Sequence, residues 1–103
     1  MSMFGTVARI RIKPGHDDEL ARIAAEITEL NPPGFVSNYV LRSKDDPQER
    51  WLVAIFESEQ AYYDNAERPE TNAQYEKWMQ ITEGQPEWHD VHVEGVNHAK
   101  ANA

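Results

Sequence analysis

The spacing of apolar positions changes several times along this chain of 103 residues. In two segments apolar and polar residues alternate, which is the period of a strand with one buried face, and two more are rich in the aromatic and β-branched residues that favour strands. In two others apolar residues recur every three to four positions, as in an amphipathic helix. The segments in chain order are a strand at 4–13, a helix at 16–30, strands at 35–42 and 50–57, a helical region at 58–84 and a strand at 88–96.

This βαββαβ order predicts an α+β, ferredoxin-like domain, with a four-stranded antiparallel sheet and helices on one of its faces. Proline and glycine mark the expected boundaries. Pro14 and Gly15 separate the first strand from the first helix, and Gly84 ends the second helical region. Ser58 is a suitable N-cap for that region, and Pro69 is expected to divide it into two helical stretches.

The strand at 50–57 carries apolar side chains on both faces. The two sets are Leu52, Ala54 and Phe56 on one face and Trp51, Val53 and Ile55 on the other. Helices cover only one face of such a sheet, and a large exposed apolar patch usually marks an association site. We therefore expect a homodimer formed through the open sheet face, with the two sheets facing each other.

Composition narrows the function classes. The length fits one domain, expected at residues 1–98, followed by a polar C-terminal tail at 99–103. The chain has no cysteine, which excludes disulfides and thiolate chemistry, and its net charge of -8 disfavours a nucleic-acid partner. No apolar run reaches the roughly 20 residues that span a bilayer, and the first residues lack the pattern of a secretory signal. We expect a cytoplasmic protein with no membrane partner.

Large side chains gather in the second helical region, where they would face the sheet. They are Tyr62, Tyr63, Tyr75, Trp78 and Met79. Such helical spacing usually means core packing. The small Ala8 and Ala54 beneath them would instead leave room for a flat ligand, with Asn38 as a polar handle. In that second interpretation the predicted substrate contacts are Asn38, Phe56, Tyr62, Tyr75 and Trp78.

The last strand carries the remaining candidate chemistry. His89 is predicted as a catalytic base for a phenolic proton, the alternative being a histidine that only satisfies a backbone partner. Asp90, His92 and Glu94 share the other face and are residue types that bind divalent metals. Alternate residues of a strand lie about 7 Å apart, however, too far for all three to reach one ion. We expect no metal site.

Four segments together resemble the antibiotic biosynthesis monooxygenase-like family of the dimeric α+β barrel superfamily. They are VARIRIKPG at 7–15, PGFVSNYV at 33–40, FESEQAY at 56–62 and PEWHD at 86–90. The resemblance implies a small homodimer, a dimeric α/β barrel, with a ligand cleft between sheet and helices. The family includes cofactor-independent oxygenases of phenols and quinols and also haem-degrading enzymes.

The resemblance also implies where the chemistry should lie. An asparagine and a tryptophan line the cleft in the phenol-oxidising branch, and Leu52 and Phe56 stand at those positions here. The haem-degrading pattern is not matched either, since Ala8 and Asn65 occupy two of its positions. The function expected is a cofactor-independent monooxygenase of a small aromatic or quinol-like molecule, with no cofactor. The alternative is a non-catalytic small-molecule-binding or structural homodimer.

Overall fold

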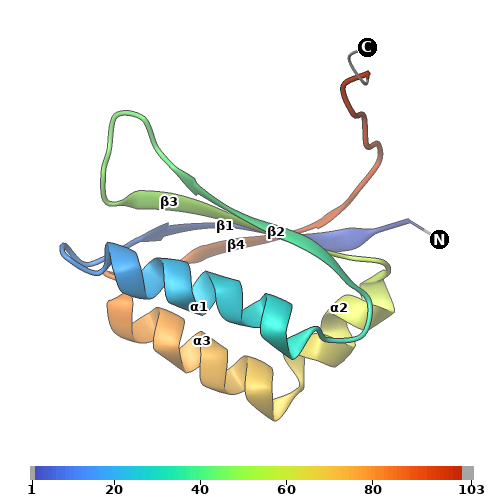
Figure 1. The fold of residues 1–103 in the computed structure, drawn as a ribbon, viewed down its shortest axis with the longest axis horizontal. Helices are drawn as coiled ribbons and strands as arrows, with labels where there is room; N and C mark the ends of the chain where they lie inside the picture. The colour runs from blue at the N-terminus through green and yellow to red at the C-terminus, as the bar shows by residue number, and fades with distance from the viewer. Residues whose placement is uncertain (1, 101–103) are drawn as a thin grey trace.

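A computed structural model describes residues 2–100 and contains the expected order of elements. The strands and helices are β1 (Phe4–Arg11), α1 (Asp17–Leu30), β2 (Phe35–Arg42), β3 (Glu49–Phe56), α2 (Glu59–Ala66), α3 (Pro69–Ile81) and β4 (Glu87–His92). The sheet order is β2-β3-β1-β4, and each neighbouring pair is antiparallel. All three helices cover one face of this sheet, which stays open in the single chain (Figure 1). The predicted ferredoxin-like fold is confirmed.

The strand register decides which side chains lie under the helices. Thr6, Ala8 and Ile10 of β1 are buried, whereas Arg9 between them is exposed. This follows from the two-residue period of a strand, whose successive side chains point to opposite faces. The packed core lies at one end of the helical layer and consists of Ile10, Ile12, Leu20, Ile23 and Ile81, with Leu52 and Trp78 packed against it.

Two polar contacts join α1 to α3, the two helices that run side by side in Figure 1. Gln74 Nε2 donates to the Ile23 carbonyl at 2.8 Å, and Lys77 Nζ lies 2.9 Å from Glu26 Oε2. Asn31 ends α1 in the left-handed region, and its N–H donates to the Ile27 carbonyl.

Within residues 2–100 no helix is long and apolar enough to cross a membrane.

Pro69 divides the second helical region, as predicted. The Ser58 hydroxyl accepts from the Ala61 N–H at 3.1 Å and caps the start of α2. Helix α2 ends at Ala66, and α3 starts with Pro69 in its first turn, where a missing N–H costs nothing. The chain turns sharply between the two helices (Figure 1), and Asn65 lies next to this corner.

The last strand is shorter than the alternating pattern predicts. It covers Glu87–His92, whereas we expected a strand over 88–96. The reason is its partner: β1 begins at Phe4, which pairs with His92, and one further bond joins the Val93 N–H to the Met3 carbonyl. Residues 93–100 have no regular structure and extend away from the helices (Figure 1). The last three residues of the predicted tail, 101–103, lie outside the described residues.

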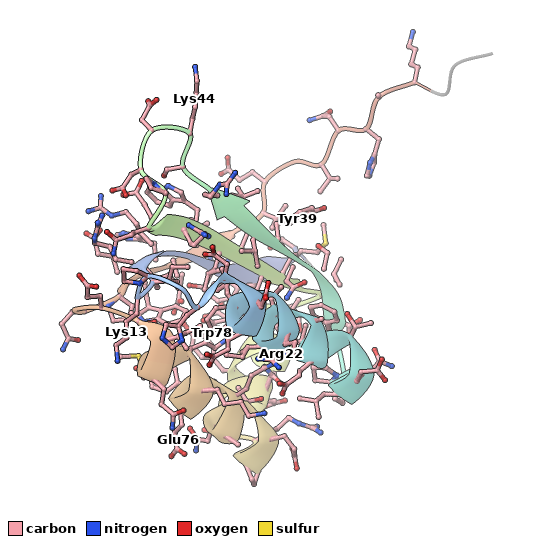
Figure 2. The ribbon with its side chains drawn as sticks, turned by 60° about the vertical axis from the view of Figure 1, so that its left-hand side comes forward. Lys13, Arg22, Tyr39, Lys44, Glu76 and Trp78 are labelled. Atoms are coloured by element: carbon pink, nitrogen blue, oxygen red, sulfur yellow. The ribbon has the colours of Figure 1, made fainter. Side chains whose placement is uncertain are left out.

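The sheet face away from the helices carries an apolar patch on β2 and β3, as the composition of the third strand indicates. Trp51, Val53 and Ile55 are half-buried, while Tyr39 and Leu41 of the neighbouring strand are 56% and 50% exposed. Figure 2 shows Tyr39 on this side of the sheet and Trp78 between the sheet and the helices. A partner copy of the chain would find an apolar patch here, formed by β2 and β3.

Candidate functional site

A cavity of about 430 Å³ lies between the sheet and the helices. Every strand and every helix contributes to its wall. Its lining comprises Thr6, Ile23, Ala24, Ile27, Asn38, Tyr39, Val40, Leu52, Val53, Ala54, Phe56, Tyr62, Asn65, Ala66, Thr71, Asn72, Gln74, Tyr75, Trp78 and Trp88. Tyr39 and Val53 contribute through their backbone, because their side chains point to the other face of the sheet. The volume falls in the range of pockets that hold small organic molecules. The helical spacing of the large side chains was compatible with a filled core or with a ligand cavity, and the structure has a cavity at this place.

Small side chains keep this part of the helix–sheet layer hollow. Ala54 sits in the centre of the sheet, where the register pairs it with Thr6 on one side and Asn38 on the other. Ala24 of α1 and Ala66 of α2 stand at the facing wall. Alanines on both layers leave a space that bulkier residues would fill, because protein interiors otherwise pack closely.

No side chain in the cavity wall carries a formal charge. Among the described residues that line it there is no Asp, Glu, Lys, Arg or His, although 27% of the chain is charged. An ion entering such a wall would lose its hydration without gaining a counter-charge, which is costly. The cavity is therefore suited to an uncharged ligand.

Amide and hydroxyl groups give the wall its polarity. Asn38 Nδ2 donates to the Ala24 carbonyl at 3.2 Å, which directs its Oδ1 elsewhere. The Thr71 hydroxyl donates to Asn65 Oδ1 at 3.0 Å, which leaves the amino group of Asn65 for a ligand. Asn72 adds a further amide at the same corner between α2 and α3. These groups can both donate to and accept from a neutral molecule.

Aromatic rings form the flat part of the wall. Phe56 is 1% exposed and meets the ring of Tyr62 edge-on, with ring centroids 5.8 Å apart. Tyr75 and Trp88 face each other across the gap between α3 and β4, and each is 43% exposed. A residue that lines a cavity and also reaches solvent marks its mouth. An aromatic ligand would find stacking partners both inside and at the entrance.

One carboxylate lies at the edge of the cavity and binds two tyrosines. The hydroxyl of Tyr62 donates to Asp90 Oδ1 at 3.1 Å, and that of Tyr63 donates to Oδ2 at 3.0 Å. Burial is the main reason why the pKa of Tyr62 rises to about 12, with the negative charge of Asp90 adding to it and contact with Thr6 opposing it. The hydrogen bond to Asp90 raises the pKa of Tyr63 as well.

The sequence-based candidates divide into two groups. All five predicted substrate contacts line the cavity: Asn38, Phe56, Tyr62, Tyr75 and Trp78. His89 does not, because it pairs with Val7 on the sheet face away from the helices. Its neighbours Trp88 and Asp90 take the helix side, as the alternation of a strand requires.

Several wall residues were not anticipated. They are Thr6, Asn65, Thr71, Asn72, Gln74 and Trp88, and Asp90 beside the wall belongs with them. Thr71, Asn72 and Gln74 are neutral polar residues at the start of α3, and this cluster was a usable signal. Among residues 2–100 no three His, Asp or Glu side chains converge to hold a metal ion.

A family model described as "Antibiotic biosynthesis monooxygenase" matches residues 3–77. No curated protein matches the chain. Among solved structures, a candidate antibiotic biosynthesis monooxygenase from Chloroflexus aurantiacus has 23% identity and a TM-score of 0.78, over 94% of this chain and 98% of its own. SnoaB, a cofactor-independent oxygenase from Streptomyces nogalater, has 16% identity and a TM-score of 0.78, over 93% and 97%. At these identities the structures show a shared fold.

Proposed function

Because the chain belongs to the antibiotic biosynthesis monooxygenase family, we propose that it is a cofactor-independent monooxygenase of a small, uncharged aromatic or quinol-like molecule. The observation that carries the proposal is the cavity itself, whose wall is aromatic and amide-lined and has no formal charge. The similarity in fold to SnoaB, a cofactor-independent oxygenase, supports the reaction type.

The reaction uses the electrons of the substrate. An electron-rich aromatic ring bearing a hydroxyl or an activated CH₂ group loses a proton to solvent water, and the resulting anion reacts with molecular oxygen. For a CH₂ group the balance is one O₂ consumed, one carbonyl formed and one water released. The protein supplies orientation and a largely apolar cavity.

The residues of this chain fit those tasks. The rings of Phe56 and Trp78 would hold the aromatic plane, and Asn38 would hydrogen-bond a substituent. The amide N–H groups of Asn65 and Asn72 would stabilise a developing oxyanion without adding a full charge. His89 was predicted from the sequence as the base, but its place on the opposite face leads us to leave it out of this mechanism.

Oxygen uptake with a panel of anthrones and quinols tests the proposal. Wild-type protein should consume oxygen and incorporate one labelled atom from ¹⁸O₂ into product. Ala54→Leu should abolish uptake, because its added bulk fills the centre of the cavity between Thr6 and Asn38. Ile55→Leu is the matched control, since this adjacent residue of β3 points away from the helices.

The outcomes separate the two functions that the sequence left open. Binding of neutral aromatics without oxygen uptake would support a non-catalytic binding protein. Failure to bind any member of the panel would contradict the proposal at its first step. Loss of uptake in His89→Ala with unchanged ligand affinity would restore His89 as the proton acceptor.

We also propose that the protein is a homodimer paired through the open sheet face. The support is the apolar surface around Trp51, Val53 and Ile55, with Tyr39 and Leu41 at least half exposed beside it. Closing two such sheets against each other would remove this surface from water. The cytoplasmic location expected from the sequence stays a prediction.

A further inference from the structure

Asp90 engages the hydroxyl protons of two neighbouring tyrosines. Its two oxygens lie 3.1 Å from the hydroxyl of Tyr62 and 3.0 Å from that of Tyr63. An ionised carboxylate can only accept hydrogen bonds, so in both bonds the tyrosine is the donor. A tyrosine hydroxyl has one proton, and here that proton is directed at Asp90. A ligand that forms a hydrogen bond with the oxygen of Tyr62 must therefore donate to it.

Packing holds Tyr62 in this orientation. Its ring meets Phe4 and Phe56 edge-on, with centroids 5.3 Å and 5.8 Å apart. Residues 4 and 56 pair directly across β1 and β3, so the ring rests on two central strands. The β1–β4 register pairs Asp90 with Thr6, on the face of the sheet that the helices cover. The hydroxyl of Tyr62 forms its hydrogen bond with Asp90 there.

Thr6 is fixed in the same sense. Its hydroxyl donates its single proton to the carbonyl oxygen of His89, at 3.1 Å, in the backbone of β4. Thr6 and Tyr62 both line the cavity and lie beside each other at the β1–β4 side. The hydroxyl proton of Tyr62 is thus directed at Asp90, and its oxygen is the acceptor that a ligand meets at this end of the cavity.

We propose that Asp90 is a positioning residue that holds the hydroxyl of Tyr62 as a hydrogen-bond acceptor toward the cavity, so that the site selects aromatic ligands that present an O–H group there. The oxygen of a methyl ether or of a quinone carbonyl can only accept a hydrogen bond, so it could not pair with the Tyr62 oxygen, which is itself an acceptor. The inference rests on the proposed function in one respect, that neutral aromatics bind in this cavity. It adds which form of the substrate, the hydroxylated one, is bound.

The test compares a naphthol with its methyl ether, with affinity followed by quenching of tryptophan fluorescence. Trp78 and Trp88 line the cavity and should report binding of either ligand. Wild-type protein should prefer the naphthol by about tenfold, the worth of one neutral hydrogen bond. In Asp90→Ala the hydroxyl of Tyr62 is released to donate into the cavity, and the preference should fall to about twofold or less. Tyr62→Phe should also lose it.

Tyr63→Phe is the matched control. It removes the other hydrogen bond to Asp90 and leaves that of Tyr62 in place, and Tyr63 is not part of the cavity wall. It should keep the wild-type preference. A purely structural role for Asp90, holding α2 to β4, would weaken both ligands equally and leave their ratio unchanged. An unchanged ratio in Asp90→Ala overturns the inference, and so does an equal loss in Tyr63→Phe.

A second measurement needs no ligand. In ¹³C-tyrosine spectra of wild-type protein, the hydroxyl of Tyr62 should titrate with the raised pKa of about 12. Asp90→Ala should lower this pKa, because a negative acceptor is removed. An unchanged pKa would contradict the hydrogen bond itself. Loss of the proposed oxygenase function has a separate signature: the naphthol preference persists while no member of the panel supports oxygen uptake.

Discussion

Tyr75 and Trp88 meet at one side of the cavity, with ring centroids 6.2 Å apart and planes inclined by 40°. Tyr75 comes from α3 and Trp88 from β4, and within the described sheet β4 pairs with β1 alone. Both rings line the cavity and both are 43% exposed. The pair therefore stands between the ligand space and solvent.

We expect Tyr75→Ala and Trp88→Ala to speed the release of a bound aromatic, because either change opens this side of the wall. The two rings should also be coupled energetically, by about 0.5–1.5 kcal/mol, as is typical of an aromatic pair. Urea unfolding of the two single variants and the double variant measures the coupling, and stopped-flow fluorescence measures release. Strictly additive effects on stability would show that the contact contributes nothing.

The sequence was sufficient for the fold because its signals agree. The two-residue and 3.6-residue periods are separated by proline and glycine at the right places, and Pro69 marked the break between α2 and α3. The alternating pattern predicted too long a last strand, since Val93 continues the alternate positions of His89 and Val91 beyond the point where β1 has residues to pair. Strand length depends on the partner as well as on the strand.

The cavity could not be settled from the sequence, because a filled core and a hollow one have the same helical spacing. Tyr62, Tyr75 and Trp78 would recur identically in both. What makes the difference is the register, which lines up Ala54 with Thr6 and Asn38 across three strands. The hydrophobic period of a single segment does not determine which residues of a distant strand it pairs with.

Gly5 provides a test of how closely β1 and β3 approach. A Cβ atom at this position would lie 2.0 Å from the backbone carbonyl oxygen of Ala54, which no rotamer change can relieve. Gly5→Ala should therefore destabilise the protein by about 4 kcal/mol or prevent folding, as expected for a forced shift of two central strands. Gly95→Ala is the control, since its nearest new neighbour would be 3.9 Å away. Urea unfolding, or soluble yield if Gly5→Ala does not fold, distinguishes them.

Asp46 should make stability depend on pH at the acidic end. Arg11 Nη1 donates to its Oδ2 at 2.6 Å, and this bond, with a second from the Gln48 N–H, holds the pKa of Asp46 below its ordinary value of 3.8. A lowered pKa in the folded state means that the contribution is complete above pH 3.8 and is lost as the pH falls through the folded-state pKa.

Asp46→Asn should accordingly be less stable than wild type above pH 3.8, and the difference should shrink as the pH falls further. Urea midpoints across the acidic range provide the measurement. Asp45→Asn is the control, because it removes the adjacent carboxylate and leaves the bond to Arg11 in place. A difference that stays constant through the acidic range would show that the carboxylate of Asp46 is not favoured by folding.

The open sheet face should determine the oligomeric state. Val53 lies at its centre, paired with Val7 of β1 and Tyr39 of β2, and the ring of Trp51 two residues away is already partly covered by Arg9 at 6.0 Å. A carboxylate in the middle of an apolar interface would have to be buried without a partner, which costs several kcal/mol per ion. Val53→Asp should therefore dissociate a dimer without touching the cavity-facing side chains of β3.

Sedimentation at micromolar protein measures the effect. Wild-type protein should sediment at twice the 11.9 kDa mass of the chain, and Val53→Asp at the mass of one chain. Ala73→Asp introduces the same charge on an exposed position of α3 and should stay dimeric. A wild-type protein that sediments as a folded single chain would leave Tyr39 and Leu41 exposed to water and would refute pairing through this face.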